Sequence, residues 1–272
     1  MSNNMNNRFI ILGTGNALVT RCYNTCFILQ NDGHNLLVDA GGGNGILRQM
    51  EDAGISFADI HDMFVTHAHT DHILGVIWVI RKVISLQTKG KYEGLFHLYS
   101  HEKVLRLLDM MCKEMLTPKF YARIGDTVLM HEVTDGDRFR AAEMDIQCFD
   151  ILSTKEKQYG FTALTSDGQR VACLGDEPFN EHDRAYVEGA DWLLSEAFCL
   201  YDDRDRFKPY EKHHSTALDT GRLAAQLGVK NLIIYHTEDK TLSTRKEKYT
   251  FEAAKAFKGC IYVPYDLEVI PF

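Results

Sequence analysis

The stretch that decides the fold is Thr66-His67-Ala68-His69-Thr70-Asp71-His72, a short run that is dense in histidine and aspartate. The residues before it, Asp62 to Thr66, have the short apolar pattern of a buried strand. The residues after it, Ile73 to Leu86, have the pattern of an apolar helix. The run therefore lies in a loop between a strand and a helix.

Four side chains of this loop can bind metal. Residues two apart in an extended loop point the same way, so His67 and His69 can share one ion. Asp71 and His72 lie on the following turn and can face a second ion, and such donors suit zinc, manganese or iron. A histidine-rich surface loop is the simpler alternative, but the spacing and the strand–loop–helix context favour a metal site.

The composition is that of a globular protein, and at 272 residues the chain can form one large domain or two small ones. The net charge of −8 argues against whole-surface affinity for nucleic acid or an anionic membrane. The seven cysteines include no CxxC pair, which indicates reduced thiols. The start, MSNNMNNRFIILG, lacks the pattern of an export signal. We therefore expect a cytoplasmic protein with no membrane partner.

Strand-rich runs occur in both halves of the chain, and each gives way to helices. Hairpin turns are predicted at Asn31-Asp32-Gly33 and Ser166-Asp167-Gly168. No repeat or long linker interrupts the pattern. We expect one domain, residues 1–272, in which two similar halves form two sheets packed face to face with helices outside. Phe64, Trp78 and Tyr99 are expected in the core.

The HxHxDH pattern after a strand resembles the metallo-β-lactamase fold superfamily. The resemblance implies a four-layer αβ/βα sandwich with a dinuclear metal site at its edge. Gly13-Thr14-Gly15 and the glycine run after Asp39 resemble the first family motif, in which Asp39 would orient the histidine-rich loop. Gly175-Asp176 resembles the motif of the bridging aspartate, and Ile233 to His236 resembles the last motif, whose histidine binds the second ion. By position alone, these would be a turn residue and a structural histidine.

One departure concerns the first ion, for which the family usually supplies a third histidine. Residues 148–160 contain none, and Leu152 occupies the expected position. The resemblance gives the second ion Asp71, His72, Asp176 and His236. It leaves the first ion with His67, His69, Asp176 and either water or a neighbour such as Asp150. We expect two divalent ions, zinc before manganese or iron, and weaker binding of the first.

Two later segments resemble the branch that contains ribonuclease Z and related phosphodiesterases. They are residues 195–198 and residues 213–217, and the resemblance implies that Glu196 and His214 protonate the leaving oxygen while a metal-bound hydroxide attacks phosphorus. The predicted catalytic residues are Asp71, Glu196 and His214. The alternative is that residues 214–216 only cap a helix.

The substrate is expected to be a small phosphodiester or short nucleotide. A transfer-RNA nuclease of this branch usually carries a long insertion that binds the transfer RNA, whereas residues 177–213 form no such arm. The chain is also acidic, and nucleic-acid binding normally needs a basic surface. Alternatives are a transfer-RNA 3′ processing endonuclease, a thioester hydrolase and a non-catalytic metal-binding or scaffold member. The segments 87–92 and 115–123 are expected near the pocket. The branch is compatible with a homodimer.

Overall fold

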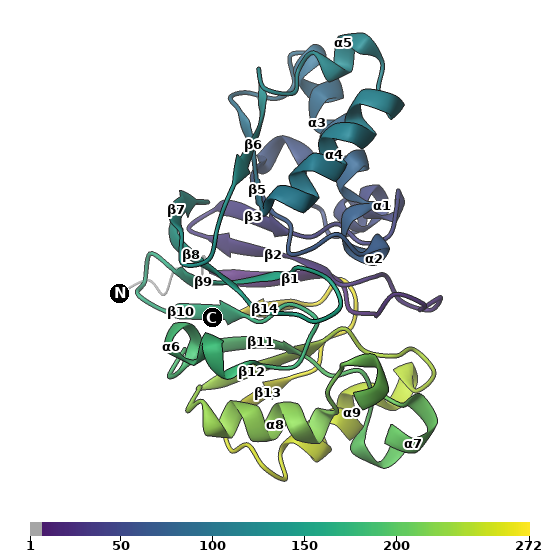
Figure 1. Ribbon diagram of the computed structural model, residues 1–272, viewed down its shortest axis with the longest axis vertical. Coiled ribbons are helices and arrows are strands. Elements are labelled where there is room, and N and C mark those ends of the chain that lie inside the picture. Colours follow the sequence, from purple (N-terminus) through teal and green to yellow (C-terminus); the bar gives the residue numbers. More distant parts are fainter. Residues whose placement is uncertain (1–6) are drawn as a thin grey trace.

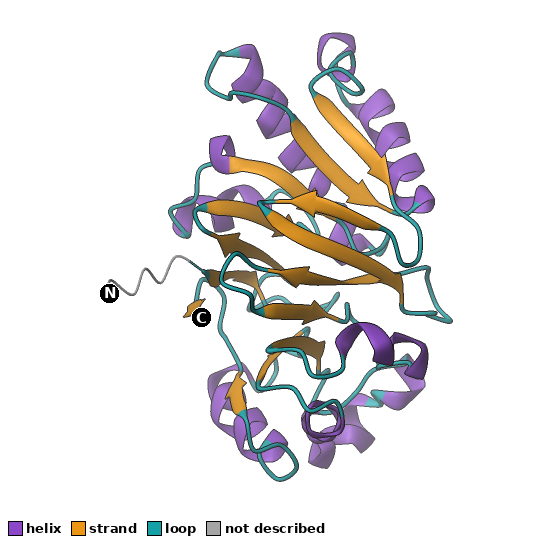
Figure 2. Cartoon of the chain, turned by 90° about the vertical axis from the view of Figure 1, so that its left-hand side faces the viewer, coloured by secondary structure: helices purple, strands orange, loops and turns teal. Residues whose placement is uncertain are grey.

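Two β-sheets packed face to face form the centre of the molecule in the computed structural model, which describes residues 7–272. The first six residues of the start, where no export signal was expected, lie outside this range. Helices α1–α5 cover one outer face and α6–α9 cover the other (Figure 1). Seen from the side, the strands form two stacked layers between the helices (Figure 2). The sandwich of four layers is therefore the architecture that the sequence predicted.

The first sheet has the order β14-β1-β2-β3-β4-β5-β6. Its strands are β1 (Arg8–Gly13), β2 (Cys26–Asn31), β3 (His34–Val38), β4 (Ile60–Phe64), β5 (Phe96–Ser100), β6 (Val128–Glu132) and β14 (Val269–Pro271). From β14 to β3 the neighbours are antiparallel, and from β3 to β6 they are parallel.

The second sheet has the order β13-β12-β11-β10-β9-β8-β7. Its strands are β7 (Arg138–Ala141), β8 (Met144–Asp150), β9 (Tyr159–Leu164), β10 (Arg170–Cys173), β11 (Trp192–Glu196), β12 (Asn231–Tyr235) and β13 (Cys260–Tyr262). It too begins with an antiparallel part, β7 to β10, and continues with a parallel part, β10 to β13. Each half of the chain thus contributes most of one sheet, as expected.

The helices follow the same division. The first sheet is covered by α1 (Gly45–Asp52), α2 (Thr70–Ile73), α3 (Val76–Thr88), α4 (Glu102–Met115) and α5 (Pro118–Tyr121). The second is covered by α6 (Arg184–Val187), α7 (Arg204–Phe207), α8 (Ala217–Gln226) and α9 (Leu242–Ala253). Among residues 7–272, no helix has both the length and the apolar character that crossing a bilayer requires.

The core consists of three apolar layers because both faces of each sheet are covered. Along β1, Phe9 and Ile11 pack between the sheets, whereas Ile10 and Leu12 pack under the helices. This alternation explains why Phe9 to Leu12 are all apolar. A third layer lies between the second sheet and its helices.

The outer helix α3 corrects one expectation about the core. Phe64 and Tyr99 are buried as predicted, but Trp78 is 37% exposed. Only one side of α3 faces the sheet, through Val79 and Val83. Trp78 lies on the other side. Its apolar neighbours in the sequence therefore led to the wrong prediction.

Candidate metal centre

The histidine-rich loop links β4 to α3. His69 has extended backbone and precedes the short helix α2, which contains Asp71 and His72. Gly75 allows α3 to begin close beneath this turn, because an added Cβ would lie 1.7 Å from the Ala40 carbonyl oxygen. The start of α3 therefore packs directly against the backbone that follows β3, and the Gly75 amide donates to the Gly41 carbonyl at 2.8 Å.

Asp39 holds the loop in place from the end of β3. Its Oδ1 accepts the Thr66 amide at 2.8 Å, and its Oδ2 accepts the Thr66 hydroxyl at 2.8 Å. The same Oδ2 lies 2.7 Å from His72 Nδ1. His72 Nε2 is buried and has no hydrogen-bond partner among the described residues. Asp39 thus orients His72 so that Nε2 is the nitrogen left for a ligand.

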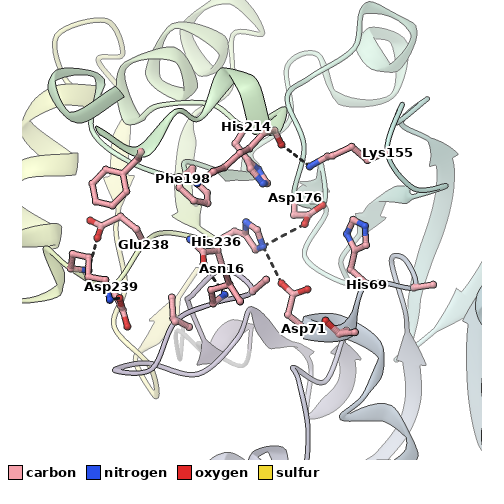
Figure 3. A pocket seen from close by; sticks show the side chains of 18 residues that line it. Asn16, His69, Asp71, Lys155, Asp176, Phe198, His214, His236, Glu238 and Asp239 are labelled. Atoms are coloured by element: carbon pink, nitrogen blue, oxygen red, sulfur yellow. Dashed lines mark hydrogen bonds and ion pairs between the residues drawn. The ribbon is translucent and has the colours of Figure 1, made fainter. Parts of the chain in front are cut away.

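The predicted ligands come together as two adjoining groups. One is His67, His69 and Asp176, and the other is Asp71, His72 and His236, with the ligand atoms of each group within 4.8 Å of one another. Asp176 connects them, because its Oδ2 lies 3.6 Å from Nε2 of both His67 and His72 and 3.4 Å from Nε2 of His236. Figure 3 shows His236 between Asp71 and Asp176.

The charges of the two groups are tightly coupled. Burial lowers the pKa of His67 well below its ordinary value, because a buried site disfavours the charged imidazolium. Burial also opposes ionisation of Asp176, but the neighbouring imidazoles, His67 first, hold its pKa well below the usual range. For His72, burial is outweighed by Asp39 and Asp71, which raise its pKa well above the ordinary value.

These residues suit a divalent cation. Imidazole nitrogens and carboxylate oxygens are the donors that zinc, manganese and iron prefer, and the orphaned Nε2 of buried His72 needs a partner. The arrangement provides carboxylates to balance the charge and nitrogens aimed at a shared centre. The centre therefore fits divalent metal ions.

Leu152, the position of the missing histidine, and Asp150, the neighbour expected to replace it, both lie outside the first ligand group. Leu152 is 49% exposed on the loop after β8, with a left-handed backbone (φ 54°). Asp150 Oδ1 accepts the Leu152 amide at 2.9 Å and belongs to neither ligand group. The suggestion that Asp150 replaces the missing histidine is therefore not supported, because its carboxylate binds its own loop.

Glu196 and His214 form a second cluster beside His236. Glu196, at the end of β11, is fully buried, and its Oε2 lies 3.6 Å from His214 Nδ1. The other carboxylate oxygen accepts the amide of Ser215. The His214 ring stacks on Phe198, and their centroids are 5.0 Å apart. The helix cap is made by Thr216, which leaves the His214 side chain free of that role.

A cavity of about 600 Å³ opens onto both clusters. His69, Asp71, Asp176, His214 and His236 line its floor (Figure 3). Its walls come from residues 16–19, Phe198, Phe207, Lys212 and residues 238–240, with Lys155 at one side. The expected segments 87–92 and 115–123 do not line it.

Two polar residues at the site were missed from the sequence. Gln158, fully buried before β9, bonds to the carboxylate and the backbone amide of Asp176. Lys155 lies at the pocket wall, where Nζ donates to the Lys212 carbonyl at 3.0 Å. Neither belongs to a motif. The only signal was their position in the stretch that lacks the third histidine.

Comparison with known proteins agrees with this geometry. The family model described as "Anti-Pycsar protein Apyc1" matches residues 7–255. Ribonuclease Z of Streptomyces avermitilis is 27% identical, over 96% of both chains, and that of Thermobifida fusca is 26% identical, over 95% of this chain and 92% of the relative.

Solved structures show the same fold. The metallo-β-lactamase fold protein YhfI from Bacillus subtilis superposes with a TM-score of 0.77 at 17% identity, over 97% of this chain and 98% of that one. Human tRNase Z, short form, gives 0.75 at 18% identity with the same coverage. A diphosphatase of the PhnP family gives 0.70 at 19% identity, over 98% and 97% of the two chains. The fold is thus the metallo-β-lactamase fold, as the sequence predicted.

Proposed function

The chain belongs to the Anti-Pycsar protein Apyc1 family, and we propose that it is a metal-dependent hydrolase of small phosphodiesters. The observation that supports this most directly is Asp176 Oδ2, which faces His67, His72 and His236 at 3.4–3.6 Å. A single carboxylate oxygen shared by two ligand groups suits a pair of divalent ions. The relatives described as ribonuclease Z add support for phosphodiester chemistry.

In this proposal the six ligands are His67, His69, Asp71, His72, Asp176 and His236. Bound ions, zinc before manganese or iron, would supply an activated water and neutralise the charge on the phosphate oxygens. Asp71 and Asp176 balance the ionic charge, and Asp39 keeps His72 in its ligating orientation.

His214 and Glu196 act on the leaving group. Glu196 Oε2 faces His214 Nδ1, so Nε2 is the atom that gives a proton to the departing oxygen. The buried carboxylate faces Nδ1 and fixes the orientation of the ring. The Phe198 ring stacks on the imidazole and limits its rotation.

The pocket favours a small substrate. A cavity of about 600 Å³ matches the size of a small-molecule site. Lys155 and Lys212 line the pocket and offer positive charge to an anion, although Lys155 Nζ also lies 3.4 Å from Glu177 Oε1 and the carboxylates of Glu238 and Asp239 line the pocket too. The chain as a whole is acidic, with a net charge of −8. These features suit a nucleotide-sized phosphodiester better than a long nucleic acid.

Turnover assays test this proposal. The purified protein, loaded with Zn²⁺ or Mn²⁺, should hydrolyse bis(p-nitrophenyl) phosphate, and a panel of cyclic mononucleotides and dinucleotides should include a better substrate. Asp176→Asn should abolish turnover, whereas His213→Ala, an exposed neighbour of His214, should retain it. A folded, metal-loaded protein that hydrolyses none of these diesters would contradict the proposal and favour the non-catalytic reading.

The second candidate is a transfer-RNA 3′ processing endonuclease. The relatives of this description match nearly the whole chain, which favours it. Precursor transfer RNA in the same panel separates the two candidates. Cleavage of the precursor without turnover of small diesters would select the endonuclease.

A further inference from the structure

Gln158 forms two hydrogen bonds with Asp176, the aspartate that both ligand groups share. It is fully buried, directly before β9, and its Oε1 accepts the Asp176 amide at 2.8 Å. Its Nε2 donates to Asp176 Oδ1. Two hydrogen bonds from one amide fix both the backbone and the carboxylate of Asp176.

These hydrogen bonds decide which carboxylate oxygen of Asp176 is available to the ligand groups. Because the Gln158 amide occupies Oδ1, Oδ2 is the oxygen that faces Nε2 of His67, His72 and His236. Rotation of the carboxylate would exchange the two oxygens and break the bond from Gln158. The side chain of Gln158 therefore selects the single oxygen that both ligand groups share.

The backbone of Gln158 is held as firmly as its side chain. Gln158 forms an isolated antiparallel bridge with His67, and the next residue donates its amide to the Thr66 carbonyl at 3.0 Å. The Gln158 carbonyl accepts the Ile151 amide at 3.1 Å. Gln158 thus connects the histidine-rich loop to the strand end that holds Asp176.

Gly175 leaves the space that Gln158 needs. An added Cβ at this position would lie 2.1 Å from Gln158 Oε1, and the backbone is left-handed (φ 72°). Both observations restrict the position to glycine. Gly175 therefore leaves room for the Gln158 side chain beside Asp176.

We propose that Gln158 is a positioning residue that fixes Asp176 and thereby lets the first ligand group hold its ion without a third histidine. This inference rests on the two-ion centre proposed above. The group of His67 and His69 has Asp176 as its only further donor among residues 7–272, so it depends on the carboxylate orientation more than the second group does.

Competition between the protein and a metal chelator tests the inference without any substrate. Gln158→Met keeps the length of the side chain but cannot form either hydrogen bond. We expect the dissociation constant of the weaker ion to rise about ten- to a hundredfold, and that of the tighter ion less than fivefold. Gln147→Met, on the half-buried strand β8, is the matched control and should change neither constant.

Gln158→Asn provides a second variant should the Met protein fail to fold. It keeps the amide but is one methylene too short to make both bonds. We expect the same selective loss of affinity for the weaker ion, but a smaller one. Equal weakening of both ions, unchanged affinities in a folded variant, or a wild-type protein that binds fewer than two ions would overturn the inference. An absence of phosphodiester turnover with this selective loss intact would count only against the proposed function.

Discussion

Glu196 Oε2 and His214 Nδ1 lie 3.6 Å apart, and neither atom has a hydrogen-bond partner elsewhere in residues 7–272. The two atoms are therefore available to each other and to a shared proton. This relationship makes His214 the strongest candidate for a proton donor at the pocket.

His214→Ala should reduce kcat according to the leaving group. For a diester with an alkyl leaving group we expect a loss of about a hundredfold or more, because the departing alkoxide needs a proton. For bis(p-nitrophenyl) phosphate, whose leaving group is stable as an anion, the loss should stay below about tenfold. Steady-state kinetics with both substrates, with His213→Ala as control, gives the comparison. Equal losses on the two would argue against proton donation.

Single-ligand variants should separate the two ions. His69→Ala removes a residue of the first group only, so the chain should lose its weaker ion and keep the tighter one. His72→Ala should instead weaken the tighter ion. Metal content measured after dialysis against a graded chelator reports both. Full and equal occupancy of two ions in wild-type protein purified without added metal would refute the asymmetry.

Leu152→His should not restore the missing ligand. The side chain is half-exposed and does not line the pocket, so a histidine there would face solvent. We expect the affinity of the weaker ion to remain within about threefold of the wild type. The chelator titration used for the other variants gives the value, and a clear tightening would show that the loop can rearrange toward the metals.

Asp183 should make stability depend on pH. Its side chain is buried and neither oxygen has a hydrogen-bond partner within the described range 7–272, and burial raises its pKa from 3.8 to about 7. Between these values the unfolded chain has lost the proton that the folded protein keeps, so the free energy of unfolding falls as pH rises through this window and stays low above it.

The neutral substitution Asp183→Asn removes this penalty. It should raise the free energy of unfolding, and with it the melting temperature, more at pH 8 than at pH 5. The two gains in free energy should differ by on the order of 1 kcal/mol. Thermal unfolding at the two pH values measures it. A variant that gains equally at both would indicate a packing effect instead.

Arg245 should be important for stability. It is fully buried in α9, and its guanidinium donates to Thr237 Oγ1 at 2.6 Å, Thr14 Oγ1 at 3.0 Å and the Pro264 carbonyl at 2.8 Å. Arg245→Met leaves these acceptors unpaired, and we expect a loss of about 3 kcal/mol in chemical denaturation. Lys248→Met, on the exposed side of the same helix, should cost less than about 0.5 kcal/mol.

The sequence predicted the sandwich and the histidine-rich loop because their patterns are local. The apolar strand before His67 and the hairpin before Asp176 can be read from neighbouring residues alone. Gln158 could not be found this way, since an amide has no characteristic spacing and its partner is far along the chain. The pocket-lining residues 16–19, Phe207 and Lys212 were also missed, because only the packing of the loops determines which of them surround the site.

Asp71 and His72 come from the first half of the chain, whereas Asp176 and His236 come from the second. An ion shared by them would act as a reversible cross-link across the seam between the halves, much as a disulfide joins distant segments. The strength of that cross-link would vary with the concentration of free metal. The resistance of the whole fold to proteases should therefore rise and fall with metal supply, even in protein that never meets a substrate.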